Sequence, residues 1–243
     1  AQAGVRVLVN SDAHGVNTLG ITRWGIVTAR RAWLTAADVA NTRPWAEFAP
    51  QPIPPEEATR HLLQQAMSAE IDAAEVPGRV IADFPDLPWK MKLDLARQIW
   101  DEVRHADMQW RRLEELGGRP DAAPVALWIS EHCGFHDDPL ARLIVLQRAA
   151  EGRAVDLHRQ RVVRLLEEQG DRETAAIFDY ILADEKGHVG FSHWINELTR
   201  DDPERRRRLL EIQRGGEERF EEIVKRRADM ARFGIQPRAV GSA

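Results

Sequence analysis

The 243-residue chain contains a single cysteine, Cys133, and a single tyrosine, Tyr180. One cysteine excludes internal disulfides and any zinc or iron–sulfur site built from several thiolates. No apolar run approaches the roughly 18 residues of a membrane-spanning helix, and the first residues lack the cationic and long apolar regions of a secretory signal peptide. We therefore expect a cytoplasmic protein that does not contact a membrane.

A strong net charge of one sign is also missing, because the formal net charge is −5 at pH 7. A mildly acidic balance argues against binding to nucleic acid, which favours basic surfaces. The composition changes near residue 50, so we predict three parts. These are a segment over residues 1–50, a proline-rich linker over 51–55 and a helical domain over 56–235.

Residues 1–50 have a mixed pattern. The run Val5–Val9 is rich in β-branched residues, a polar loop follows, and residues 20–31 have a helical pattern. We expect a short strand, loop and helix here. The linker that follows contains three prolines and cannot continue a helix.

The rest of the chain has apolar residues at helical spacing, interrupted by helix breakers. The Pro77-Gly78 pair should end or kink the first helix, and Gly117-Gly118 and Gly170 should end the next helices. The fold class that we predict is all-α, a four-helix bundle made of two helical hairpins with an extra C-terminal helix. The expected helices are residues 55–76, 89–116, 138–169, 171–199 and 203–232.

The pattern D-E-x-x-H occurs twice in the predicted helices, at Asp101–His105 and at Asp184–His188. A Glu and a His three residues apart lie on one face of a helix, about one turn from each other. Two such pairs, together with one inward Glu from each of two other helices, form the ligand set of dinuclear carboxylate bundles. The repetition is therefore stronger evidence than either motif alone.

Glu70 and Glu151 are the candidates for the two additional carboxylates, because each interrupts an apolar helical stripe. A buried carboxylate is costly unless a cation or a proton neutralises it. Glu75 competes with Glu70 but lies off the stripe. His158 shares the face of Glu151, but seven residues separate them by about 10.5 Å along a helix, too far to bind the same metal pair. The alternative, charges on a solvated helix face, does not explain the apolar stripes.

The metal ligands predicted from this pattern are Glu70, Glu102, His105, Glu151, Glu185 and His188. Carboxylates and imidazoles suit iron or manganese, and two divalent ions balance four carboxylates. Ligand histidines usually donate their second ring N–H to a carboxylate. We expect Asp184 to accept from His105, and Asp101 to accept from His188.

The sequence of residues 95–106, LARQIWDEVRHA, followed by LEELGG at 113–118, resembles the ferritin-like di-iron carboxylate superfamily and its DUF455 group. The resemblance covers about residues 55–200 and implies a ferritin-like bundle with the six ligands above. It also implies chemistry with O2. N-oxygenases of the superfamily have an additional His where this chain has Ile181, and Tyr180 does not match the tyrosine of a ribonucleotide-reductase-type radical.

Residues 9–15, VNSDAHG, and residues 25–34, GIVTARRAWL, are similar to the C-terminal end of PHP-domain phosphoesterases. That resemblance implies Asp12 and His14 as a second, weaker candidate metal pair. The other ligands of a PHP barrel have no counterpart in the chain. We therefore expect residues 1–50 to be part of a truncated barrel without phosphoesterase activity.

The function predicted from the sequence is that of a di-iron oxidoreductase, with two Fe, two Mn or one of each as cofactor. It would oxidise an unknown substrate with O2, and the residues that act in catalysis beyond the ligands are unknown. The first alternative is a ferroxidase or a metal-storage or metal-handling protein. The second is a non-catalytic bundle with a structural metal pair. A homodimer remains open.

Overall fold

The structure is a computed structural model that describes residues 57–120, 128–133, 136–161 and 170–226. All secondary structure in these residues is helical, as predicted. The predicted strand, the proline-rich linker and the candidates Asp12 and His14 lie outside the described residues. None of the described helices is long and apolar enough to cross a membrane.

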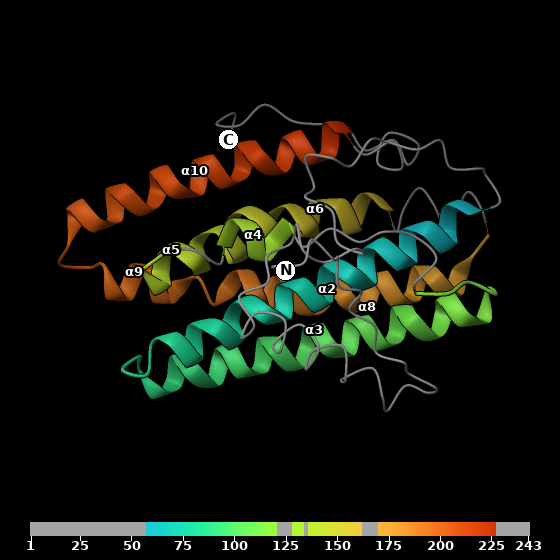
Figure 1. The fold of residues 1–243 in the computed structure, drawn as a ribbon, viewed down its shortest axis with the longest axis horizontal. Helices are drawn as coiled ribbons and strands as arrows, with labels where there is room; N and C mark the ends of the chain where they lie inside the picture. Colours follow the sequence, from blue (N-terminus) through green and yellow to red (C-terminus); the bar gives the residue numbers. More distant parts are fainter. Residues whose placement is uncertain (1–56, 121–127, 134–135, 162–169, 227–243) are drawn as a thin grey trace, which may run out of the picture.

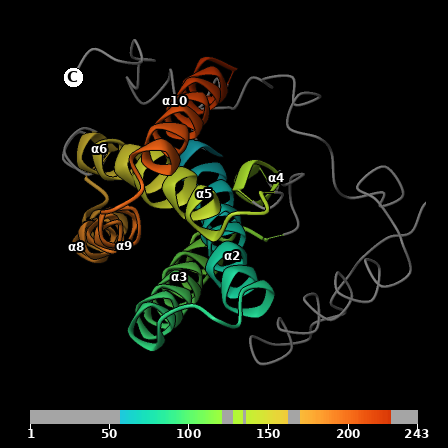
Figure 2. The ribbon, with the colours of Figure 1, turned by 90° about the vertical axis from the view of Figure 1, so that its left-hand side faces the viewer.

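Four long helical segments form the bundle (Figure 1). Helices α2 (Ala58–Asp83) and α3 (Trp89–Glu115) form one hairpin. The third segment is α5 (Pro139–Ile144), the π-helical turn η5 (Val145–Ala150) and α6 (Glu151–Arg161), and the fourth is α8 (Arg172–Gly190) followed by α9 (His193–Leu198). Helix α10 (Pro203–Arg226) lies outside these four, against α5 and η5, and the short α4 (Trp128–Cys133) lies beside α2 (Figure 2).

Helix α2 does not end at Pro77, which corrects the predicted end at residue 76. A proline inside a helix removes one hydrogen bond and costs about 3 kcal/mol or more. Val76 and Val80 are completely buried on either side of it. Burial of one valine side chain stabilises by about 1.5–3 kcal/mol, so packing of the two valines is large enough to offset the proline.

The ends of α3 follow the sequence signals. The helix starts directly after Pro88 and ends where Gly117 has a φ of 72°. The amide of Gly117 donates to the Glu114 carbonyl at 2.9 Å, and that of Gly118 donates to the Leu113 carbonyl at 2.8 Å. A left-handed residue of this kind is the common way to end a helix, and glycine adopts it without strain.

The third and fourth predicted helices are both interrupted. The third contains η5 directly before Glu151, and the fourth breaks at Phe191 and Ser192. The amide of Phe191 donates to the carbonyls of Gly187 and His188, and two nearby glycines, Gly187 and Gly190, have low helix propensity. Apolar spacing does not distinguish a continuous helix from one with such local changes.

The core is divided by a polar layer. One apolar cluster includes Leu62, Leu113 and Phe178, and the other includes Val80, Leu95 and Ile195. The buried Glu and His residues of α2, α3 and α8 lie in sequence between the residues of the two clusters. The candidate metal centre therefore lies in the middle of the bundle, with apolar packing at both ends.

Candidate metal centre

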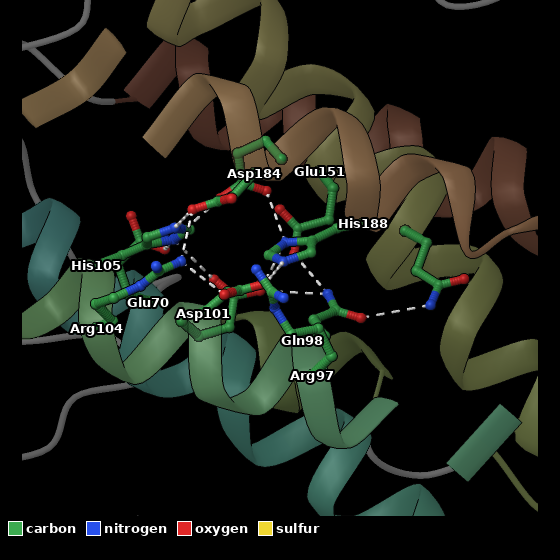
Figure 3. A network of polar contacts seen from close by, with 12 residues as sticks. Glu70, Arg97, Gln98, Asp101, Arg104, His105, Glu151, Asp184 and His188 are labelled. Carbon is green, nitrogen blue, oxygen red and sulfur yellow. Dashed lines mark hydrogen bonds and ion pairs between the residues drawn. The ribbon is translucent and has the colours of Figure 1, made fainter. Parts of the chain in front are cut away.

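Each of the four long segments brings at least one buried ligand candidate to the polar layer (Figure 3). Helix α2 supplies Glu70, and Glu151 is the first residue of α6. Helices α3 and α8 each supply a Glu and a His from the repeated motif. All six residues are buried, at most 6% exposed, and they are Glu70, Glu102, His105, Glu151, Glu185 and His188.

The six residues form two overlapping groups of four. One group contains Glu70 and His105, the other contains Glu151 and His188, and both contain Glu102 and Glu185. Within each group the potential ligand atoms lie within 4.8 Å of one another. Two groups that share two carboxylates could hold two ions, with Glu102 and Glu185 between them.

Both histidines present the same ring nitrogen to the centre. His105 Nδ1 lies 3.6 Å from Glu70 Oε2, 3.5 Å from Glu102 Oε2 and 3.5 Å from Glu185 Oε1. His188 Nδ1 lies 3.2 Å from both Glu102 Oε1 and Glu185 Oε2. The Nε2 atoms therefore point away from the carboxylate cluster and are available for outer partners.

The outer partners are the aspartates of the opposite motif. His105 Nε2 lies 3.2 Å from Asp184 Oδ2, and His188 Nε2 lies 3.5 Å from Asp101 Oδ2. The hydrogen bond expected between His105 and Asp184 is present. His188 Nε2 faces Asp101 as expected but forms no hydrogen bond with the described residues. Each aspartate precedes its own glutamate along the chain, so its side chain leaves the helix beside the ligand face and reaches across to the other helix.

Arg104 connects the two outer aspartates (Figure 3). Its guanidinium donates to Asp101 Oδ1 at 2.6 Å and to Asp184 Oδ2 at 2.7 Å. It also donates to the Tyr180 hydroxyl at 2.7 Å and lies 5.1 Å from the centroid of that ring. Arg104 thus forms ion pairs with both aspartates, one of which faces His105 and the other His188.

Buried glutamines donate hydrogen bonds to three of the candidate ligand carboxylates. Gln98 Nε2 donates to Glu102 Oε1 and Glu151 Oε1, both at 3.2 Å, and Gln109 Nε2 donates to Glu70 Oε1 at 3.0 Å. Sequence analysis did not identify them. The available signal was spacing, because Gln98 and Gln109 each lie four residues from a motif ligand on α3.

Electrostatics favour protons or metal ions in the cluster. Burial raises the pKa of Glu70, Glu151 and Glu185 above the ordinary range, and the charge of a neighbouring carboxylate raises it further. For Glu151 the pKa rises to about 8. Burial also opposes ionisation of Glu102, but the adjacent imidazoles of His105 and His188 outweigh it, so its pKa is lowered.

The histidines respond in the opposite sense. Burial lowers the pKa of each imidazole, but close contacts with carboxylates outweigh it, first with Glu102 in both cases. The pKa of His105 rises to about 11 and that of His188 to about 9. Without metal, bound protons balance the negative charge of the carboxylates. Divalent cations would take over this role, because a metal ligand must lose its proton.

The donor set fits a pair of hard or borderline divalent ions. Glu102 Oε2 and His105 Nδ1 are buried and have no hydrogen-bond partner among the described residues, although both point into the cluster. Unpaired buried polar atoms are costly, and a bound ion would satisfy them.

The two residues that competed for a ligand role lie outside the cluster. Glu75 forms an ion pair with Arg79 at 3.2 Å, and His158 stacks on Phe178 with ring centroids 5.3 Å apart.

A family model described as "Protein of unknown function (DUF455)" matches residues 38–234. The chain belongs to this family. The match includes all six candidate ligands of this DUF455 chain. It begins before the proline-rich stretch at residues 51–55. The division of the chain into three parts remains a prediction. Neither the curated proteins nor the solved structures compared with the chain gave a match.

Proposed function

We propose that this DUF455 chain binds two iron or manganese ions at the centre and oxidises a substrate with O2. The observation that carries the proposal is the pair of four-residue groups that share Glu102 and Glu185. Four carboxylates and two histidines on four helices are the ligand set of the di-iron and di-manganese carboxylate bundles, the ferritin-like proteins that the sequence resembles.

In this proposal Glu70 and His105 hold one ion, Glu151 and His188 hold the other, and the two shared glutamates lie between them. The bound pair would supply the electrons that reduce O2. The aspartates orient the imidazoles so that Nδ1 faces the ions, and hydrogen bonds to the second ring nitrogen make a ligand more basic. Gln98 and Gln109 fix the ligand carboxylates. The two apolar clusters exclude water from the layer, which strengthens its electrostatic interactions.

Oxygen consumption by the ferrous protein tests this function. We expect protein loaded anaerobically with two Fe²⁺ per chain to consume O2 and then to stop until a reductant is added. Substitution of Glu102 by Gln should abolish this reaction. Continued oxidation of added Fe²⁺ far beyond two per chain would indicate a ferroxidase or storage protein. Loaded iron that does not react with O2 would indicate a structural metal pair.

A further inference from the structure

A cavity of about 70 Å³ lies against the carboxylate cluster, between α2 and the segment formed by η5 and α6. Three ligand candidates, Glu70, Glu151 and Glu185, contribute to its lining. Neither histidine of the cluster lines it, and neither do the outer aspartates nor Arg104. The cavity therefore reaches the centre on a side other than the Arg104 network.

Five alanines line the cavity between the helices. On α2 they are Ala66, Ala69 and Ala73, spaced so that they share one face with Glu70. Ala150 and Ala154 face them from η5 and α6, on either side of Glu151. A larger residue at any of these positions would fill space next to a ligand carboxylate.

Larger apolar residues close the remaining sides. They are Ile129 from α4, Leu157 from α6 and Phe220 from α10. The position of Ile129 is fixed by Asp72, a fully buried residue of α2. Asp72 accepts hydrogen bonds from the amides of Ile129 at 2.7 Å and Ser130 at 3.2 Å. The wall is therefore tied to the helix that carries Glu70.

We propose that this cavity is the chamber in which O2 and the reacting part of the substrate meet the metal pair, and that this part is a small, uncharged, apolar group. The inference rests on the proposed function and names the class of its substrate. A charged group would lose its hydration against alanine, leucine and phenylalanine side chains, which is costly without a partner. Apart from the three ligand carboxylates, the polar lining residues are Gln65 and His158.

The size of the cavity sets an upper limit on that group. An engineered apolar cavity of about 150 Å³ binds benzene, and this cavity has about half that volume. It accommodates O2 together with a few carbon atoms. An entry path for metal ions would instead require oxygen ligands along its wall, and the lining outside the cluster is mainly hydrocarbon.

Three isoelectronic probes of the metal-free 243-residue chain test the chemistry of the cavity: xenon, iodide and caesium. We expect crystals to show xenon in the cavity, with iodide and caesium absent from it. Occupancy by caesium would indicate an ion path, and absence of xenon would contradict an apolar chamber. Either result overturns the proposal, and because no metal is needed, the outcome does not depend on the proposed function.

Filling the cavity gives the second test. Ala154→Leu, or Ala66→Leu as an independent variant, should remove the xenon site and slow the oxidation of the ferrous protein by O2 at least tenfold. The metal content and the rate of Fe²⁺ loading should stay unchanged. Ala96→Leu is the control, because Ala96 is exposed on α3. An unchanged oxidation rate, or loading slowed as much as oxidation, would overturn the proposal.

Discussion

At the residue scale, the centre consists of ligand candidates and of the residues that hold them. Arg104 belongs to the second group, since it contacts the two aspartates that contact the two histidines. Arg97 also pairs with Asp101, at 2.7 Å, but its side chain is 59% exposed and it does not reach Asp184. Comparison of substitutions at the two arginines therefore distinguishes loss of the link between both aspartates from loss of one exposed ion pair.

Arg104→Gln should weaken metal binding by about 10- to 100-fold, the usual cost of losing an outer partner of a metal ligand. The aspartates would then repel each other and turn away from the imidazoles. Competition titrations of Mn²⁺ or Fe²⁺ measure this directly. Arg97→Gln is the matched control and should change the affinity little, because exposed ion pairs contribute little. Equal effects of both substitutions would refute the special role of Arg104.

Glu185→Gln should abolish binding of the metal pair without lowering the stability of the metal-free protein. A glutamine has the same shape but removes a carboxylate whose pKa burial raises well above its usual value. Its charge is therefore a cost in the absence of metal. Metal analysis and chemical denaturation with a chelator present measure the two effects. Glu75→Gln should retain full metal content, and lower stability of metal-free Glu185→Gln would contradict the account.

At the element scale, helix packing shows what the sequence could and could not predict. The predicted helix over residues 89–116 agrees with α3 to within one residue at its end, because the Gly117-Gly118 signal acts on the local backbone. The predicted end of the first helix at residue 76 was wrong, because burial of Val76 and Val80 beside Pro77 is a tertiary effect. The π-helical turn before Glu151 was not predicted for a related reason. Apolar spacing does not show where a helix widens locally to accommodate an extra residue.

The contact between α10 and η5 depends on Gly216. A Cβ atom there would lie 3.1 Å from Val145 Cγ1 and 3.3 Å from Ala149 Cβ, whereas a Cβ at Gly215 would meet no atom within 4 Å. Gly216→Leu should therefore lower the free energy of unfolding by about 1–3 kcal/mol, the usual cost of overpacking.

Gly215→Ala is the natural comparison in the same helix turn. Alanine is favoured over glycine inside a helix by about 1 kcal/mol, so this variant should be slightly more stable than the parent. Urea denaturation of both variants measures the difference. If Gly216→Leu is as stable as the parent, α10 does not pack on η5 as described.

At the scale of the whole molecule, a polar layer between two apolar clusters links stability to pH. Without metal, the folded chain holds protons at Glu151 up to about pH 8 and at His188 up to about pH 9, against ordinary pKa values of 4.5 and 6.5. A group whose pKa is raised by folding stabilises the folded state fully when the pH is below its unfolded pKa. This stabilisation is lost as the pH rises through its pKa in the folded state.

We therefore expect the melting temperature of the metal-free protein to fall as the pH rises towards 9, the value at which His188 loses its proton. Metal binding requires deprotonated ligands, so stabilisation by added Mn²⁺ should increase over the same range. Scanning calorimetry with chelator and with metal measures both curves. The same decline with and without metal would show that the cluster is not the metal site.

Much of the site followed from the sequence because its ligands repeat at helical spacing within apolar stripes. Helix periodicity predicted that Glu70, Glu102 and Glu185 face one interior, and the structure brings them together. The cavity and the Arg104 contacts could not be predicted this way. They depend on how two different hairpins pack together, and periodicity within one helix does not contain that information.

The central claim is that one chain binds two ions that share Glu102 and Glu185. Anomalous diffraction from crystals of the Mn²⁺-loaded protein, recorded at the manganese edge, tests it most directly. The account predicts two peaks, one beside Glu70 and His105 and one beside Glu151 and His188. A single peak, or none in a correctly folded chain, would contradict it.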